Sequence, residues 1–350
     1  LLIDRIACRL GFDWFARRLP IEVPPAYVFV TTVLGIQIGI IAPFNYFVAD
    51  KVSIANDPLS ILVPIGLTIA VVGIHWMQDS YAEAIVSLRL PDQETDANQR
   101  STLFEEIIPF RAKLIAWAIG LAIFYLTLFV LLGVSTAIEI EGIVQTLFAN
   151  AIVVPLVSMP LITEFAMLYV GIHVLMPRRI AKADLDLFFY DPRDMGGFAK
   201  IGQLLKRSYY LYTTGLLLYF SLTYGPTIFN DILYTPYPEP TAPVAAIFTL
   251  LWFTGVISIA YSMYRVHVVM ASKKVQRINE IEQELRDLLD DPYDINSSNL
   301  ANHSKREEIQ HRLEQVRSTR EYPSTFTMWT QIAISVILPQ ALNLAIQAAA

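Results

Sequence analysis

Long apolar runs separated by polar connections set the pattern of this chain of 350 residues. A helix needs about 20 predominantly apolar residues to cross a hydrocarbon core of ~30 Å, where it must satisfy its own backbone hydrogen bonds. Seven runs have this length and character: residues 26–48, 59–77, 114–134, 143–176, 209–229, 244–270 and 326 to about 347. The pattern predicts an all-α fold, a polytopic integral membrane protein with seven transmembrane helices.

The fourth run, residues 143–176, is longer than one straight crossing requires, because a helix of that length extends ~51 Å. Two short crossings are the alternative, and the positions of Lys and Arg decide between them. Of 26 such residues, four precede the first run, four lie between the second and third, seven between the fourth and fifth, and nine between the sixth and seventh. If the fourth run crosses once, these four segments share one side, and the opposite side carries only Lys51.

This distribution follows the positive-inside rule and predicts a cytoplasmic N-terminus and an extracytoplasmic C-terminus. Splitting the fourth run would place the later basic connections on the wrong side. We therefore expect a single crossing that is kinked or partly unwound around Asn150, Pro155 and Pro160 and that extends beyond the bilayer.

Four regions follow from this topology. They are a cytoplasmic amphipathic N-terminal segment (1–23), a six-span region (24–270) with cytoplasmic connections 78–113 and 177–208, a cytoplasmic helical hairpin (271–325), and the seventh transmembrane helix (326–350). In the N-terminal segment Ile3, Ile6, Leu10 and Trp14 recur at helical spacing. This spacing fits either docking on the membrane surface or packing on the inner ends of the spans.

The predicted hairpin carries an apolar stripe on each arm, at Val275, Ile278, Ile281, Leu285 and Leu288 and then at Ile309, Leu313 and Val316. Its first arm continues the sixth run as one helix. The stripe must therefore pack on the returning arm, on the connection over residues 180–205, or on a neighbouring subunit. In that connection we expect the pair Gly196 and Gly197 to supply unusual backbone angles or a close helix approach.

Composition narrows the class of protein. Hydrophobic residues make up 54% of the chain and charged residues 17%, with a mean hydropathy of +0.46. These values exclude a soluble globular enzyme, in which about 25% of residues are charged. The single cysteine, Cys8, excludes an internal disulfide framework and a cysteine-based metal site. The net charge of −6 argues against a nucleic-acid partner.

Glu164 is the acid inside the fourth run. An ionisable side chain within a span is costly and is normally directed at a cavity, a partner or an ion path. One interpretation is a site for a cation or a proton; the other is a hydrogen-bonded acid that ties the fourth run to Tyr212, Thr213 or Thr214 of the fifth. His173 lies nine residues further on, nearly on the opposite helix face, so one helix alone supports no relay between them.

Two polar features suggest a path through the membrane. The seventh run carries an uncharged stripe of pore or polar-path candidates, Gln331, Ser335, Gln340, Asn343 and Gln347. Hydrogen bonding to neighbouring helices is the alternative reading of this stripe. The predicted outer segments contain the acids Asp50, Asp57, Glu139, Glu141, Asp231 and Glu239. Against the single base Lys51, they should form an electronegative outer mouth that concentrates cations.

One acidic cluster offers a hint of enzymatic chemistry. Asp290, Asp291 and Asp294 spell DDxxD, a spacing by which polyprenyl-transferring enzymes hold Mg²⁺ on a diphosphate. Such a site needs a second acidic cluster on a facing helix, and the adjacent Pro292 and Asn-Ser-Ser favour a solvated turn. HExxH, GxSxG and GxGD patterns are absent from the sequence. We therefore expect no enzymatic activity and no cofactor.

These features favour an oligomeric ion channel of the plasma membrane, cation-conducting, with the last span lining the path in a homo-oligomer. In outline, seven spans with an inside N-terminus, a long helical connection before the last span and an outside C-terminus resemble the insect olfactory and gustatory receptor channels. This resemblance is one of architecture and carries no site residues. The alternatives are a membrane sensor or scaffold whose cytoplasmic stalk binds a protein partner, and a small-solute or ion-coupled transporter that uses Glu164.

Overall fold

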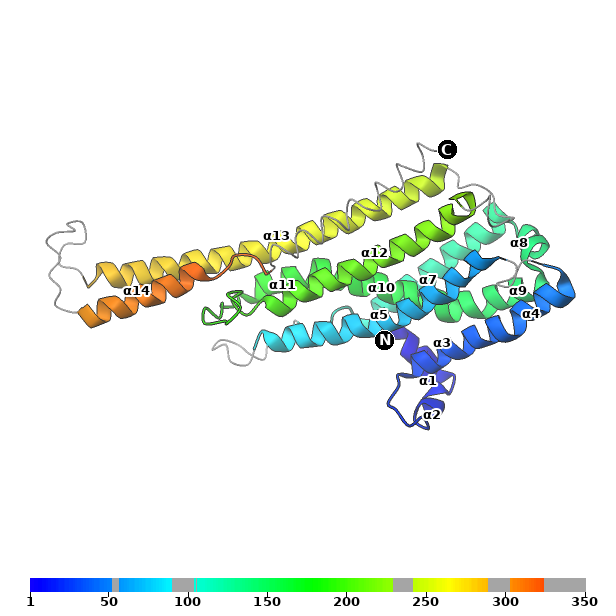
Figure 1. The fold of residues 1–350 in the computed structure, drawn as a ribbon, viewed down its shortest axis with the longest axis horizontal. Helices are drawn as coiled ribbons and strands as arrows, with labels where there is room; N and C mark the ends of the chain where they lie inside the picture. The colour runs from blue at the N-terminus through cyan, green and yellow to red at the C-terminus, as the bar shows by residue number, and fades with distance from the viewer. Residues whose placement is uncertain (52–56, 90–103, 105, 229–241, 289–302, 324–350) are drawn as a thin grey trace.

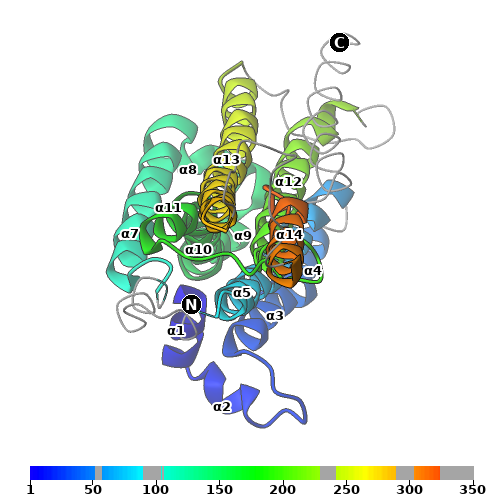
Figure 2. The ribbon, with the colours of Figure 1, turned by 90° about the vertical axis from the view of Figure 1, so that its left-hand side faces the viewer.

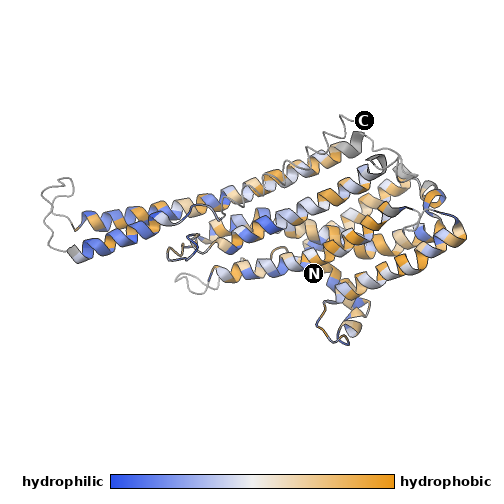
Figure 3. Ribbon diagram, viewed as in Figure 1, coloured by the Kyte–Doolittle hydropathy of each residue, from blue (hydrophilic) through white to orange (hydrophobic). Residues whose placement is uncertain are grey.

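The computed structural model describes residues 1–51, 57–89, 104, 106–228, 242–288 and 303–323, and its regular elements within these ranges are all helices. Most of the helices run along one long axis, and α1 and α2 project to the side (Figure 1). Apolar residues gather in one half of the molecule, and the far ends of α13 and α14 are polar (Figure 3). The fold is therefore an apolar helix bundle with a polar extension.

The elements follow one another as short and long helices. They are α1 (Leu2–Arg9), α2 (Phe12–Ala16), α3 (Pro25–Ile36), η1 (Gln37–Ile41), α4 (Ala42–Phe44), η2 (Asn45–Ala49), η3 (Pro58–Ile61), α5 (Leu62–Ser87), α7 (Phe110–Thr127), η5 (Leu128–Leu132), α8 (Val134–Glu141), α9 (Ile143–Phe148), η6 (Ala149–Ser158), α10 (Met159–Val170), η7 (Gly171–Leu175), α11 (Met176–Ala183), α12 (Ala199–Ile228), α13 (Ala242–Arg286) and α14 (His303–Ser318). The η segments are π-helical except for η3, a 3₁₀ turn.

Five helices of the described residues are long and apolar enough to cross a membrane: Pro25–Ala49, Leu59–Ser87, Phe110–Val130, Ile143–Ala183 and Ala246–Arg286. They correspond to the first, second, third, fourth and sixth apolar runs and indicate a multi-pass membrane protein. The fifth run lies in α12, where many Tyr and Thr residues lower the hydropathy. The seventh run, residues 326–347, lies outside the described residues. Seven spans and their orientation remain a prediction.

The fourth run is one uninterrupted helical path from Ile143 to Ala183. From its sequence this run is expected to be kinked or partly unwound around Asn150, Pro155 and Pro160, and in the structure the chain stays helical there but departs from the α pattern. In η6 the spacing widens to the π pattern, in which an amide donates to the carbonyl five residues earlier. Widening accommodates Pro155 without breaking the helix.

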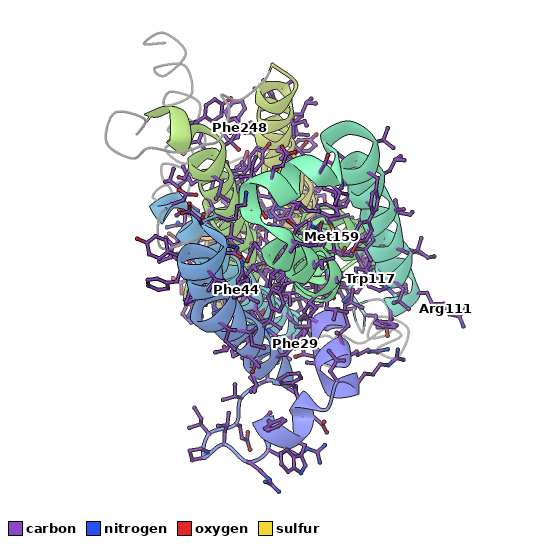
Figure 4. The ribbon with its side chains drawn as sticks, turned by 90° about the vertical axis from the view of Figure 1, so that its right-hand side faces the viewer. Phe29, Phe44, Arg111, Trp117, Met159 and Phe248 are labelled. Carbon is purple, nitrogen blue, oxygen red and sulfur yellow. The ribbon has the colours of Figure 1, made fainter. Side chains whose placement is uncertain are left out.

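The main core lies among α3, α5, α10, α12 and α13, where Ile74, Leu161, Ile172 and Tyr209 are almost inaccessible to solvent. At one end, Phe248 of α13 is fully buried against α12 (Figure 4). In contrast, α7 has no buried residue in the described structure, and Ile115, Ile119 and Ile123 are exposed along it. Such an apolar outward face suits contact with lipid chains.

The N-terminal segment packs into the bundle through α1, whose Leu2, Ile3 and Ala7 are buried. Gly11 (φ 87°) then turns the chain, and Leu10 and Trp14 are about half exposed. The amphipathic segment of the sequence thus forms two parts. Helix α1 packs against the inner ends of the helices, and the residues from Leu10 to Trp14 lie nearer the surface. We use "inner end" for the predicted cytoplasmic end of the bundle, where α3, α7 and α12 begin.

Candidate functional site

Glu164 lies in α10 with its side chain fully buried. One carboxylate oxygen pairs with the Lys113 ammonium of α7, and the other accepts a hydrogen bond from the backbone amide of Leu2 at 2.8 Å. The Lys113 side chain is also largely buried, at 13% exposure. Both oxygens of the acid are therefore occupied by donors from α1 and α7, and these contacts favour a structural role.

The residues of α12 named as possible partners of Glu164 make other contacts. Thr213 donates to the Tyr209 carbonyl at 2.8 Å and Thr214 to the Tyr210 carbonyl at 2.9 Å, both within α12. The Tyr212 hydroxyl donates to the Leu251 carbonyl of α13. Hydroxyls in apolar helices commonly bond to the preceding turn in this way, which removes them as partners for a neighbouring acid.

Two further hydrogen bonds join side chains of α7 to the helix of the fourth run. In a π pattern, Pro155 lacks the amide that would bond to the carbonyl of Asn150, and the Tyr125 hydroxyl donates to that carbonyl at 2.5 Å. Close by on the same helix, the Trp117 indole donates to the Pro155 carbonyl at 3.1 Å. Figure 4 shows Trp117 directed at this helix, whereas Arg111 points away from the bundle.

Lys113, Trp117 and Tyr125 follow one another at steps of four and eight residues, so they share one face of α7. We call these three contacts, with Glu164, Pro155 and Asn150 as acceptors, the α7 clamp. A buried carbonyl without a donor costs roughly 1–3 kcal/mol, and more where water is excluded. The clamp therefore fixes a helix that otherwise buries little of its surface.

The clamp predicts a double-mutant result. Tyr125→Phe should lower the free energy of unfolding by about 1–2 kcal/mol, because the Asn150 carbonyl loses its donor. In a Pro155→Ala background the restored backbone amide can serve that carbonyl, so the same substitution should cost less. Thermal unfolding of the four variants in detergent measures this coupling. An equal cost in both backgrounds would contradict the assigned role of Tyr125.

A second buried cluster joins three helices at His173 of η7, whose side chain is fully buried. Its Nδ1 lies 3.0 Å from the Ser262 hydroxyl of α13, and its Nε2 lies 2.9 Å from the Ser208 hydroxyl of α12. A neutral imidazole donates once and accepts once, so one serine must donate to the ring and the other must accept. One helical turn away, the Tyr169 hydroxyl lies 2.7 Å from that of Ser258.

Glu164 and His173 thus belong to separate clusters. The acid contacts α1 and α7, whereas the imidazole contacts α12 and α13. The nine-residue spacing predicts this divergence, and the structure joins the two groups by no hydrogen bond among the described residues.

Asp4 and His75 form an ion pair that fixes α1 to α5. His75 Nε2 lies 3.1 Å from one Asp4 carboxylate oxygen, and its Nδ1 lies 2.8 Å from the Val71 carbonyl. Burial by itself raises the pKa of Asp4, but the hydrogen bond and positive charge of His75, together with the N-terminal ammonium and the Ala26 amide, lower the pKa below its usual value. Asp4 also accepts from the Ala26 amide at the start of α3.

Helices α13 and α14 lie side by side in the polar extension (Figures 1 and 2). Ile281, Ile309 and Val316 are buried between them, together with the half-buried Phe189 from the connection before α12. Arg312 donates to the Glu284 carboxylate at 3.0 Å, and Gln315 donates to the Phe189 carbonyl at 3.0 Å. The apolar stripe of α13 is expected from the sequence to pack on the returning arm, on the connection over residues 180–205 or on a neighbouring subunit. In the structure it packs on the returning arm, α14, and on Phe189 of that connection.

The connection between α11 and α12 is held by hydrogen bonds between its own backbone amides and one of its side chains. Gly196 (φ 58°) and Gly197 (φ 85°) take left-handed conformations, so the expected unusual backbone angles are confirmed. The Asp191 carboxylate accepts hydrogen bonds from the amides of Arg193 at 3.0 Å and Gly197 at 2.9 Å. These hydrogen bonds fix the connection on which α14 packs through Phe189.

After α14 the chain returns to the inner end between α12 and α13. Lys274 donates to the Thr319 carbonyl at 2.7 Å, and the Tyr322 ring stacks on His267 at 4.0 Å between ring centres. A Cβ atom on Gly202 would overlap the Pro323 carbonyl. Residues 319–323 therefore pack closely against α12 and α13, directly before the predicted seventh run.

The acids of the predicted outer mouth differ in their surroundings. Asp50 and Glu139 are exposed. Asp57, at 2% exposure, caps η3 by accepting from the Leu59 amide at 3.2 Å and the Ser60 hydroxyl at 2.6 Å. Burial raises the pKa of Glu141. Asp231 and Glu239 lie outside the described residues. Among the acids of the predicted outer mouth in the described part of the chain, Asp50 and Glu139 are therefore the two whose side chains are exposed.

The remaining predicted site residues also lie outside the described residues. These are the polar-path candidates Gln331, Ser335, Gln340, Asn343 and Gln347 and the weak metal candidates Asp290, Asp291 and Asp294. Within the described ranges, no group of three or more His, Cys, Asp or Glu side chains is arranged to hold a metal ion.

Sequence reasoning missed the polar partners that join the helices. Lys113 counted only as a base of an inner connection, although its spacing from Trp117 and Tyr125 marks one face of a helix. The sequence gives less indication that Ser208 and Ser262 contact His173, because each is a single small polar residue in apolar surroundings.

Comparisons of this chain with protein-family models, with curated proteins and with solved structures find no match.

Proposed function

We propose that this multi-pass membrane protein is an oligomeric ion channel, cation-conducting, in which residues 326–347 line the path. The observation that carries the proposal is the return of the chain at Pro323, where residues 319–323 are fixed against α12 and α13. The uncharged polar stripe of the sequence begins eight residues later, at Gln331. A polar span that starts from a fixed position at the inner end is well placed to border a pore.

The surroundings of Glu164 support a channel over a transporter. A midplane transport site needs ligand groups that are free to exchange an ion or a proton. Both carboxylate oxygens of Glu164 are occupied, by Lys113 and by the Leu2 amide. The exposed acids Asp50 and Glu139 add negative charge near the predicted outer end, which favours cations. We also propose that the protein has no enzymatic activity.

A cysteine-accessibility experiment tests the path. Cys8 is the only cysteine and is exposed, so Cys8→Ser gives a cysteine-free background. Single cysteines at Gln331, Ser335 and Asn343 should react with a positively charged thiosulfonate reagent in planar bilayers. Each modification should block most of the cation current, because it places a bulky positive charge in the path.

The matched control is Ile119→Cys on the exposed face of α7, where modification should leave the current unchanged. Conduction that is indifferent to modification at all stripe positions would show that the path lies elsewhere. Absence of conduction under any ligand, voltage or tension would overturn the channel proposal.

A second candidate, a membrane sensor or scaffold, is favoured by the α13 and α14 pair. Its ion pairs, such as Arg312 with Glu284 and Arg317 with Glu282, give the polar extension a charged surface beyond the apolar half (Figure 3). A protein that co-purifies with the native chain but not with a chain in which the exposed charges of α14 are reversed would support this candidate.

A further inference from the structure

A cavity of about 440 Å³ opens at the inner end, between α1, the end of α5 and the start of α7. Its volume lies within the range of roughly 300–1,000 Å³ that is typical of small-molecule sites. Its lining combines apolar side chains, among them Ile85, Ile108 and Leu168, with the basic residues Arg5 and Lys113. The contacts of residues 319–323 that carry the proposed channel lie away from this cavity, and Lys113, the partner of Glu164, lines it.

The wall formed by residues 106–108 is held in place from outside the cavity. The Arg179 guanidinium donates to the carbonyls of Glu106 at 2.8 Å and Ile107 at 3.0 Å. A Cβ atom on Gly171 would overlap the Ile107 side chain, so this glycine allows the wall to approach η7 closely. These contacts make the cavity a built feature of the described fold.

The opposite wall is fixed by the pair of Lys113 and Glu164, which leaves Lys113 engaged. Arg5 is different: its guanidinium lies 3.7 Å from the centre of the Phe110 ring, and no carboxylate of the described residues pairs with it. Gln78 also lines the cavity, and its side-chain amide makes no hydrogen bond to any described residue. Glu106 is the single acid among the described lining residues, and its side chain is exposed.

We propose that this cavity binds an anionic amphiphile, with a carboxylate or phosphate headgroup at Arg5 and Gln78 and an apolar chain along Ile85, Ile107 and Leu168. A guanidinium that stacks on an aromatic ring keeps its N–H edge free for an anion and offers it two parallel hydrogen bonds. Basic pockets between helices at the inner face of a membrane suit anionic headgroups. The ligand can arrive as a lipid of the inner leaflet or as a free fatty acid.

Native mass spectrometry of the full chain in detergent distinguishes these sources. The probes are oleate, dioleoyl phosphatidylserine and, as the zwitterionic reference, dioleoyl phosphatidylcholine. We expect saturable retention of oleate, phosphatidylserine or both in preference to phosphatidylcholine. Retention of oleate alone identifies a free amphiphile, retention of phosphatidylserine alone identifies a lipid, and retention of both identifies the headgroup charge as the common determinant.

Two variants test the site itself. Arg5→Gln should weaken retention of the anionic probe about tenfold, because it removes the charge-assisted hydrogen bonds. Ile85→Trp should abolish retention by filling the apolar part of the cavity. Arg9→Gln is the matched control: it changes an exposed arginine of the same helix that does not line the cavity.

The thermal unfolding of each variant shows whether it is folded when binding is measured. Three outcomes overturn the proposal: no saturable retention of either anionic probe, equal retention of phosphatidylcholine, or the same loss for Arg9→Gln as for Arg5→Gln.

Discussion

Glu164→Gln should strongly destabilise the folded protein, by about 3–5 kcal/mol, because it leaves the Lys113 ammonium charged, buried and unpaired. The acid is fully buried and its partner is 13% exposed, so water can compensate little for the lost charge. The measurement is the unfolding of the purified protein in detergent. A matched control is Glu83→Gln at the more exposed pair of Glu83 and Lys200, where solvent screens the charges, so this substitution should cost far less stability than Glu164→Gln.

Removing both charges should recover most of this loss. In Lys113→Met/Glu164→Gln no uncompensated charge remains, and replacing both partners of a buried ion pair is often nearly neutral. A Glu164→Gln protein that keeps its stability would show that the pair does not hold α7. If that stable variant also lost coupled uptake in proteoliposomes, the transporter interpretation would replace the channel.

Gly202→Ala should disrupt the return of the chain to the inner end. The added Cβ would overlap the Pro323 carbonyl, which is backbone and cannot rotate away as a side chain does. Because residues 319–323 are also fixed by Lys274 and His267, we expect a loss of stability of about 2 kcal/mol or more. In the proposed channel the cation current should fall as well, since the seventh run begins from this position.

Gly215→Ala is the control on the same helix, because a Cβ there meets nothing within 4 Å. Alanine in a helix interior should leave stability unchanged or raise it by up to about 1 kcal/mol. Equal behaviour of the two variants would contradict the tight packing of Pro323 on α12.

The helical fold could be predicted from the sequence because hydropathy and length are local properties. Five apolar runs correspond to helices that can span a membrane. The ends of the helices were less accessible to prediction. Helix α5 continues to Ser87, ten residues beyond the apolar run, because a helix can persist where its apolar character fades. In α12 the prediction of a span rests on length, since its tyrosines reduce its hydropathy.

The partners of Glu164 could not be predicted, since they come from α1 and α7, 162 and 51 residues away. One of the two interpretations of Glu164 placed its partners on the next run along the chain, but helix neighbours in a bundle are set by packing and not by chain order. The sequence also does not show how the helix accommodates Pro155. A proline removes one amide, and whether the helix then breaks depends on whether another side chain, here Tyr125, serves the free carbonyl.

The unbroken length of α13 gives the molecule mechanical leverage. Its 45 residues form a helix ~68 Å long that belongs to the apolar half at one end and to the polar extension at the other. A rod of that length that tilts by about 5° around one end moves its far end by roughly 6 Å. Because α14 is bound along it, a small reorientation within the membrane would be magnified outside it, and a force applied to the polar extension would act on the helix bundle with the same mechanical advantage.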